Sequence, residues 1–334
     1  MIMMFGDFAA KIETLYLCTK LKRNQIKMIK SFEGLTSFLV EKKQRQRMIV
    51  AGLTDESTKT AVAEALRQGV ISVTFVGADE SIVNDPVFEG VTDFVSVKTC
   101  ASSDEDAVAL EAVRCINEGK GDFLMKGLIH TDNLLRAVLN KEEGLLKKGS
   151  VLAHVAVAQL RKYDKLLFFC DSAVIPEPTF EQRLAQVDYL IKTCRSFGIS
   201  QPKLAMIHFT EKVNPKYSCT TDYQTIKKEA ENGRWGDLVI DGPLDTRTAV
   251  DPVALSIKGI DSPVEGKADA LLFPNLETAN SFYKTVSYFA DAQIAGMLYG
   301  TKCPIVVTSR GDDHLSKYYS ILAAANLHAY SKNV

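Results

Sequence analysis

The sequence lacks several patterns that would each indicate a particular class of protein. Its seven cysteines include no C-x-x-C pair and its five histidines no H-E-x-x-H motif, so neither a disulfide framework nor a zinc site is indicated. No G-x-G-x-x-G follows a predicted strand and no G-x-x-x-x-G-K-S/T occurs, which disfavours nicotinamide and ATP chemistry. We expect no metal site; an ion held by scattered residues is the alternative.

The chain also lacks an excess of charge and a long apolar run. Its 40 Lys and Arg residues balance 41 Asp and Glu residues, which gives a net charge of −1. No overall field therefore draws the protein to nucleic acid or to a membrane, and any anion site has to be local. No apolar run reaches the roughly 18 residues that span a bilayer. The scattered cysteines favour reduced thiols, so we expect a cytoplasmic protein.

What the sequence does contain is enough apolar material for a large core. Of the 334 residues, 46% are apolar and 24% are charged, as is usual for a globular protein. This length exceeds what one core usually serves, so two domains are expected. Residues 1–27 are expected to be an N-terminal extension. Most of their basic residues follow the apolar and acidic ones, unlike a secretory signal, and a helix-forming start appears at Met28.

Predicted strands and helices alternate along the whole chain, which indicates an α/β fold with a parallel sheet. We predict strands over residues 48–51, 71–76, 94–97, 121–127, 151–157, 165–170, 202–208, 237–241, 270–273 and 305–307. We predict helices over residues 28–40, 54–68, 104–117, 131–139, 180–197, 222–232, 246–257, 276–298 and 315–327.

A candidate phosphate site follows the last predicted strand. Ser309 and Arg310 stand at its carboxyl end, just before a helix begins. In an open α/β sheet ligands bind at that edge, and a helix N-terminus offers free N–H groups to an anion. The planar guanidinium of Arg310 matches two phosphate oxygens at once. A binding site for phosphate or acyl phosphate is one interpretation. A surface ion pair of Arg310 and a helix cap at Ser309 is the second interpretation.

Two further segments carry candidate ligand contacts. Lys126 and Gly127 end the strand 121–127, and the next helix carries Arg136, so two cations lie near one strand terminus. Alternatively, Lys126 extends its ammonium into solvent and Arg136 pairs with Glu142 or Glu143.

Asn280 and Lys284 share one face of the predicted helix 276–298, where they can converge on one ligand oxygen. A solvated helix face explains this spacing equally well.

Several segments together resemble a known family. In the C-terminal half these are Asp241-Gly242-Pro243-Leu244, Ser262-Pro263-Val264 with Gly266, Ala268-Asp269, Asn280-x-x-Tyr283-Lys284, and Pro304-Ile305-Val306 leading to Ser309-Arg310. Others are Leu124 to Leu128 through Thr131, Leu135 to Lys141, Tyr163 to Leu167 and Val213 to Lys216. In this order, over about residues 28–325, they resemble the phosphate acyltransferases, the phosphotransacetylases and phosphotransbutyrylases. The second group resembles the butyryl branch in particular.

The resemblance implies a fold and a reaction. The implied fold has two α/β domains across a cleft, similar in architecture to isocitrate and isopropylmalate dehydrogenases. The first domain would comprise residues 28–149 plus 297–334, and the second residues 150–296. The implied partners are small molecules: butanoyl-CoA and phosphate would give butanoyl phosphate and CoA reversibly, by direct attack in a ternary complex. Family members use no metal or bound cofactor and usually form homodimers.

The resemblance also implies roles for the candidate residues. Arg310 and Arg136 would hold the phosphate, and Ser309 would donate a hydrogen bond to it or to the carbonyl oxygen. Asp312 or Asp313 would ionise the CoA thiol, with Asp312 ranked first. This assignment is open because the acetyl branch has its acid where this chain has Ser316.

The remaining substrate contacts would come from Lys126, Gly127, Asn280 and Lys284. In place of butyryl, the transferred group could be acetyl or another short acyl chain. Two further hypotheses are a non-catalytic module that senses acyl-CoA and a metal-dependent dehydrogenase of similar fold.

Overall fold

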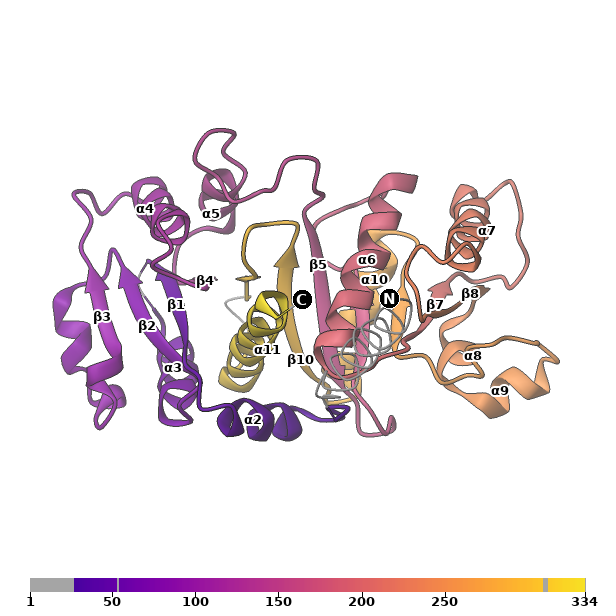
Figure 1. Cartoon of the computed structure of the whole chain (residues 1–334), viewed down its shortest axis with the longest axis horizontal. Coiled ribbons are helices and arrows are strands. Elements are labelled where there is room, and N and C mark those ends of the chain that lie inside the picture. The colour runs from indigo at the N-terminus through magenta and orange to yellow at the C-terminus, as the bar shows by residue number, and fades with distance from the viewer. Residues whose placement is uncertain (1–26, 53, 309–311, 334) are drawn as a thin grey trace, which may run out of the picture.

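The protein is built around one large sheet. The structure, a computed structural model, describes residues 27–52, 54–308 and 312–333, so the predicted extension lies almost wholly outside the described residues. The described strands form an 11-stranded sheet with helices on both faces (Figure 1). In spatial order they are β3 (Val95–Lys98), β2 (Ile71–Val76), β1 (Gln46–Ala51), β4 (Phe123–Lys126), β11 (Ile305–Val306), β10 (Gln293–Tyr299), β5 (Ala153–Gln159), β6 (Leu167–Cys170), β9 (Ala270–Leu272), β7 (Lys203–Ile207) and β8 (Val239–Leu244).

The sheet consists of two parallel halves with an antiparallel centre. The first half-sheet comprises β3, β2, β1, β4 and β11, and the second comprises β6, β9, β7 and β8. Antiparallel pairing of β11 with β10, β10 with β5 and β5 with β6 joins them. The two half-sheets therefore run in opposite directions. This arrangement confirms the predicted α/β class with a mainly parallel sheet flanked by helices.

The helices lie on both faces of this sheet. They are α2 (Phe32–Glu41), α3 (Glu56–Arg67), α4 (Glu105–Asn117), α5 (Thr131–Val138), α6 (Phe180–Ser196), α7 (Ser218–Glu231), α8 (Thr246–Val250), α9 (Pro252–Ile257), α10 (Leu276–Phe289) and α11 (His314–Lys332). Short 3-10 turns cover Glu80–Asn84, Pro86–Phe88 and Thr92–Phe94. No helix in these described ranges has both the length and the apolar content to cross a membrane.

Two predicted helices were partly wrong. The predicted helix 276–298 ends at Phe289, and residues 293–299 instead form β10. Asp291, with a φ of 47°, turns the chain between them. In β10, Ala295 and Met297 face one core while Ile294 and Leu298 face the others, a period of two that defines a strand. The predicted helix 246–257 is divided into α8 and α9 because Pro252 keeps the residue before it extended.

The proposed division into domains stays a prediction. Residues 28–149 with 297–334 contain the first half-sheet and α11, and residues 150–296 contain β5 and the second half-sheet. The predicted boundary between residues 296 and 297 falls inside β10.

One face of the sheet is covered along its whole width, whereas the other carries two separate groups of helices. A single hydrophobic cluster joins α2, α3, α11, α6 and α7 on the covered face. On the opposite face one cluster packs beneath α4 and α5, and another packs beneath α8, α9 and α10. The central strands lie between these two groups, which leaves room for a site over the middle of the sheet.

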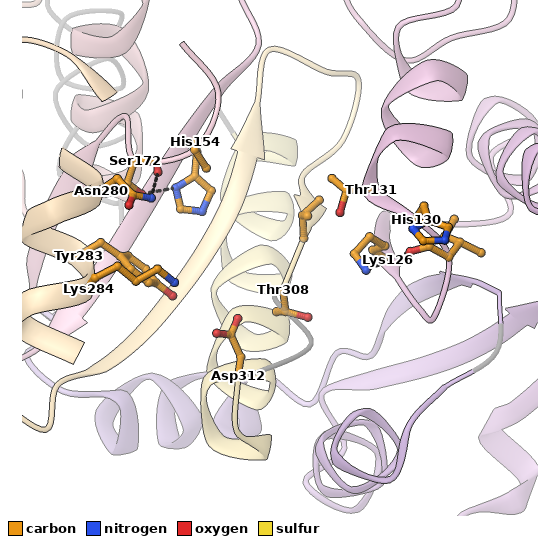
Figure 2. A pocket seen from close by; sticks show the side chains of 13 residues that line it. Lys126, His130, Thr131, His154, Ser172, Asn280, Tyr283, Lys284, Thr308 and Asp312 are labelled. Carbon is orange, nitrogen blue, oxygen red and sulfur yellow. Dashed lines mark hydrogen bonds between the residues drawn. The ribbon is translucent and has the colours of Figure 1, made fainter. Parts of the chain in front are cut away.

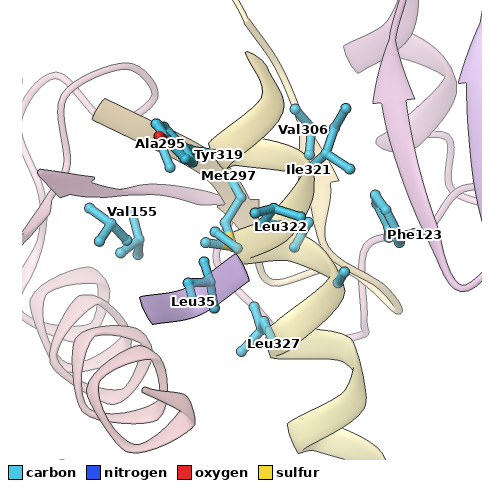
Figure 3. Packing of buried hydrophobic residues seen from close by; sticks show 14 of the residues in the cluster. Leu35, Phe123, Val155, Ala295, Met297, Val306, Tyr319, Ile321, Leu322 and Leu327 are labelled. Atoms are coloured by element: carbon cyan, nitrogen blue, oxygen red, sulfur yellow. The ribbon is translucent and has the colours of Figure 1, made fainter. Parts of the chain in front are cut away.

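Helix α11 supports the centre of the sheet from the covered face. Its Ile321 and Leu322 are fully buried and pack with Val306 of β11 and Met297 of β10 (Figure 3). A helix that is apolar around most of its circumference has to be buried. This packing fixes the strand that precedes the candidate phosphate motif.

Candidate active site

A cavity of about 480 Å³ opens over the centre of the sheet, between α5 and α10. Strand β11, which lies between β4 and β10, is only two residues long, and side chains that follow the ends of β4, β6 and β11 meet there. The described residues that line it are Lys126, Ile129, His130, Thr131, His154, Ser172, Ala173, Asn280, Tyr283, Lys284, Val307, Thr308 and Asp312 (Figure 2).

The two residues of the candidate phosphate motif, Ser309 and Arg310, lie outside the described residues, and their predicted roles stay predictions. The segment leading to them does reach the cavity, since Val307 and Thr308 line it. Asp312, on the other side of the motif, lines it too.

Lys126 brings a positive charge to the cavity from the end of β4. Its side chain is buried rather than extended into solvent. Its Nζ donates to the carbonyl oxygen of Gly127 at 3.1 Å and to that of Ile129 at 3.2 Å. These bonds hold the ammonium at the wall of the cavity, where an anionic substrate group would meet it.

Arg136 is not among the residues that line the cavity. Its side chain is 65% exposed on α5, and its Nη1 donates to both oxygens of Asp106, at 2.6 and 2.8 Å. A surface ion pair was one of the two interpretations, but Glu142 and Glu143 were the wrong partners. Whether Arg136 meets Arg310 at a phosphate stays a prediction.

Helix α10 forms the opposite wall of the cavity. Asn280, Tyr283 and Lys284 all line it, which confirms that Asn280 and Lys284 share a face. Nδ2 of Asn280 donates to the carbonyl oxygen of Ser172 at 3.0 Å. Nζ of Lys284 lies 4.9 Å from the centre of the Tyr283 ring. Burial, together with the carboxylates of Asp312 and Asp313, raises the pKa of Tyr283, so its hydroxyl stays protonated.

The two candidate carboxylates have different surroundings. Asp313 is the N-cap of α11, and its Oδ1 accepts the N–H of Ser316 at 2.8 Å. Asp312 instead contributes to the cavity wall. Asp313 thus caps a helix and Asp312 lines the cavity, while the identity of the base stays a prediction.

Two polar residues of the cavity wall were not predicted from the sequence as site residues. They are His154 at the start of β5 and Ser172 after β6. Oγ of Ser172 lies 3.1 Å from Nδ1 of His154 (Figure 2). Burial lowers the pKa of His154 to about 4, so its imidazole is neutral near pH 7. The only available signal was a polar residue inside an otherwise apolar strand.

The loop that carries Ser172 is held by Asp171. Its carboxylate accepts the N–H groups of Ala173, Val174 and Ile175 at 3.0, 3.1 and 3.3 Å, and also that of His154. Burial raises the pKa of Asp171 to about 6, although these hydrogen bonds oppose the shift. Asp171 therefore joins the end of β6 to the start of β5.

The arrangement suits group transfer involving an anion. Lys126 and Lys284 supply positive charge from opposite walls, and neutral hydrogen-bonding groups lie between them. No group of three or more His, Cys, Asp or Glu side chains that could hold a metal ion occurs within residues 27–52, 54–308 and 312–333.

Comparison with known proteins identifies relatives of this chain. The family model described as phosphate acetyl/butaryl transferase matches residues 93–325. The chain is 38% identical over 300 residues to the phosphate butyryltransferase of Clostridium acetobutylicum, covering 89% of this chain and 98% of that one. It is 32% identical to the phosphate acetyltransferase of Thermotoga maritima, covering 84% and 94%. The crystal structure of a branched-chain phosphotransacylase from Enterococcus faecalis superposes with a TM-score of 0.74 at 27% identity, covering 85% and 99%.

Proposed function

This chain belongs to the phosphate acetyl/butaryl transferase family, and from that premise we propose that the central cavity binds a short-chain acyl-CoA together with phosphate. The protein is an acyltransferase that moves an acyl group reversibly between CoA and phosphate. Within that reaction our specific proposal is a preference for butanoyl-CoA. The 38% identity to a butyryltransferase, against 32% to an acetyltransferase, supports this preference.

The proposed step is direct attack. A phosphate oxygen attacks the thioester carbonyl carbon, the carbonyl electron pair moves onto oxygen, and the C–S bond breaks to release CoA as a thiolate. In the reverse direction a base has to ionise the thiol, whose pKa is about 8.5. The observation that carries this proposal is the placement of Lys126 and Lys284 on opposite walls of one cavity, with Asp312 beside them.

We propose that the reaction needs no metal or bound cofactor. The thioester already activates the acyl group, and no atom changes its oxidation state. Charge on the phosphate would be neutralised by Lys126 and Lys284, with Arg310 added from the sequence motif.

The test is a panel of acyl-CoA substrates. Phosphate-dependent release of CoA from acetyl-, propionyl-, butanoyl- and hexanoyl-CoA is followed by trapping the free thiol. We expect the highest kcat/KM with butanoyl-CoA, although each methylene changes discrimination by only about 1–3 kcal/mol. Acetyl-CoA as the best substrate would overturn the butyryl preference. A protein that binds acyl-CoA without releasing CoA would instead be the sensing module.

We also propose that the protein forms a homodimer through α9 and α10. Tyr288 and Phe289 of α10 are 79% and 81% exposed, and Val253 and Ile257 of α9 are 64% and 80% exposed. Pro252, at the start of α9, and Phe289 line one pocket, so the two helices are neighbours there, and large exposed apolar side chains near one another indicate a protein contact. Light scattering should give twice the 36.8 kDa chain mass. Phe289→Asp should yield monomers.

The control for this interface is Leu139→Asp. Leu139 is also an exposed apolar residue, at 43%, but it lies at the end of α5, over the first half-sheet. This variant should remain dimeric. A monomeric wild type, or a dimer that survives Phe289→Asp, would contradict the proposed interface.

A cytoplasmic location is part of the same proposal. The described cysteines at positions 100, 115, 170, 194, 219 and 303 are all free thiols. Reduced thiols are typical of proteins in a reducing compartment.

A further inference from the structure

His154 presents its imidazole to the cavity from the middle of the sheet. It stands on β5 opposite Leu298 of β10, and Gly296 lies two residues further along β10. A Cβ at Gly296 would lie 2.5 Å from Nε2 of His154, so the ring occupies the space that this glycine leaves. Figure 2 shows the ring with one nitrogen toward Ser172 and the other toward the cavity.

The ring is held on its Nδ1 side by a chain of hydrogen bonds. Oγ of Ser172 lies 3.1 Å from Nδ1, and both side chains are buried. The carbonyl oxygen of Ser172 in turn accepts Nδ2 of Asn280 at 3.0 Å. The carboxylate of Asp171 binds the N–H of His154 itself and those of the loop after Ser172. Three elements, β5, α10 and the loop after β6, thus fix one ring.

These contacts favour one tautomer of the neutral ring. The contact of 3.1 Å between Oγ of Ser172 and Nδ1 fits either direction, but within the described residues a hydroxyl that only accepted there would leave its own buried proton without an acceptor, so we take Ser172 as the donor. When Ser172 donates to Nδ1, the proton of a neutral imidazole is on Nε2. Burial keeps the ring neutral by lowering its pKa. The nitrogen on the cavity side is then an N–H donor.

We propose that His154 is a further catalytic residue of this transferase, whose Nε2–H donates a hydrogen bond to the carbonyl oxygen of the acyl group. Ser172 and Asn280 are positioning residues that hold the ring. The inference rests on the proposed function. A neutral donor suits an oxygen that gains negative charge only during attack, whereas Lys126 and Lys284 suit the phosphate, which is charged throughout.

The step balances without proton transfer by His154. As the phosphate oxygen bonds to the carbonyl carbon, the carbonyl pair moves onto its oxygen and accepts the Nε2–H. When that pair returns, the C–S bond breaks and the thiolate leaves with its electrons. The imidazole keeps its proton on Nε2 throughout.

Two variants separate the donor from the packing. His154→Gln places an amide nitrogen near the position of Nε2, whereas His154→Asn keeps a polar group near Nδ1 and loses the donor. We expect His154→Asn to lower kcat by about 100- to 1,000-fold with little change in KM, as for loss of one oxyanion donor. His154→Gln should recover at least about tenfold of that loss. Equal losses in both variants, or a kcat for His154→Asn within about threefold of wild type, would overturn the proposal.

A measurement on the intact protein covers the case in which the variants fold poorly. Nitrogen-15 spectra of the wild-type imidazoles, assigned with His154→Gln, should show His154 as the neutral Nε2–H tautomer at pH 7. Ser172→Ala should allow the other tautomer. A charged ring or an Nδ1–H tautomer in the wild type would overturn the proposal.

Failure of the proposed function and failure of the His154 role give different results. A wild type that releases no CoA from any acyl-CoA overturns the proposed function, and the role of His154 with it. An active wild type with an unaffected His154→Asn overturns only the role of His154.

Discussion

Nζ of Lys317 lies 2.9 Å from Oδ1 of Asp55 and 3.1 Å from Oδ2, and this ion pair joins α11 to the first turn of α3. The Lys317 side chain is only 2% exposed, whereas that of Asp55 is 32% exposed. Asp55 also caps α3 by accepting the N–H of Thr58 at 2.7 Å. The pair therefore anchors the helix that follows the candidate phosphate motif.

Substituting Asp55 and substituting Lys317 should lower the free energy of unfolding by different amounts. Asp55→Asn keeps an N-cap acceptor but leaves a buried ammonium without its counter-ion, which costs about 3–5 kcal/mol. Lys317→Met removes the buried charge and leaves a carboxylate that water still reaches, so the loss should be smaller. Urea denaturation measures both. Glu229→Gln, in the exposed pair with Arg234, is the control and should change stability by less than about 1 kcal/mol. Equal losses for Asp55→Asn and Lys317→Met would contradict this account.

Most of the fold could be predicted because each strand outside the centre is an apolar run bounded by turn residues. Every predicted strand corresponds to an observed one, and β10 is the strand that the prediction missed. Residues 293–299 follow a helix without a proline or a wide polar loop, so the local pattern favours continuing the helix. Strand pairing with β5, about 140 residues away, decides the outcome instead. Such distant pairing leaves no trace in local spacing.

The sequence indicates which side chains come together where they extend from strand ends or share a helix face, while their roles stay predictions. Lys126, Asn280, Lys284 and Asp312 all reach one cavity, as the sequence indicates. Arg136 has a charged neighbour on α4 that spacing along the chain could not reveal. The contact between His154 and Ser172 likewise joins β5 to the loop after β6, which are distant in the sequence.

Asp312 and Asp313 allow a comparison of adjacent carboxylates. In the direction that forms acyl-CoA, we expect Asp312→Asn to lower kcat by about 100-fold or more, because a positioned base would be lost. Raising the pH through about 8.5 should recover part of this rate, since the thiol then ionises unaided. Asp313→Asn retains an N-cap acceptor for Ser316 and should stay within about threefold of wild type. Activity assays with purified variants decide this, and similar losses in both would assign the base elsewhere.

Gly296 offers a way to move the His154 ring without removing it. The backbone of Gly296 needs no left-handed conformation, so alanine is accommodated except for the clash of its Cβ with Nε2. We expect Gly296→Ala to lower kcat by about 10- to 100-fold, because small displacements of a reacting geometry are costly. Gly34→Ala in α2 is the control: its Cβ would meet nothing closer than Oγ of Ser31 at 3.4 Å, and activity should not change. A kcat for Gly296→Ala equal to that of wild type would show that catalysis does not depend on the position of the His154 ring.

The low pKa of His154 predicts a pH dependence of stability that a variant can isolate. The unfolded chain binds a proton at His154 below about pH 6.5, but the folded protein does so only below about pH 4. Between these values the unfolded state holds more protons, so the folded state loses stability as the pH falls.

The expected size of this loss is about 3 kcal/mol between pH 7 and pH 4, at 1.36 kcal/mol per pKa unit. In His154→Gln, position 154 carries no titratable group. The difference in unfolding free energy between wild type and this variant should therefore shrink by about 3 kcal/mol as the pH falls from 7 to 4. Asp171, which binds the backbone N–H of His154, is present in both proteins and cancels in the difference. The same holds for the other titratable groups of the cavity lining, which are Lys126, His130, Tyr283, Lys284 and Asp312. Denaturation free energies of the two proteins at pH 7, 5.5 and 4 provide the measurement. A difference that stays constant with pH would mean that His154 is charged in the folded protein at the same pH as in the unfolded chain.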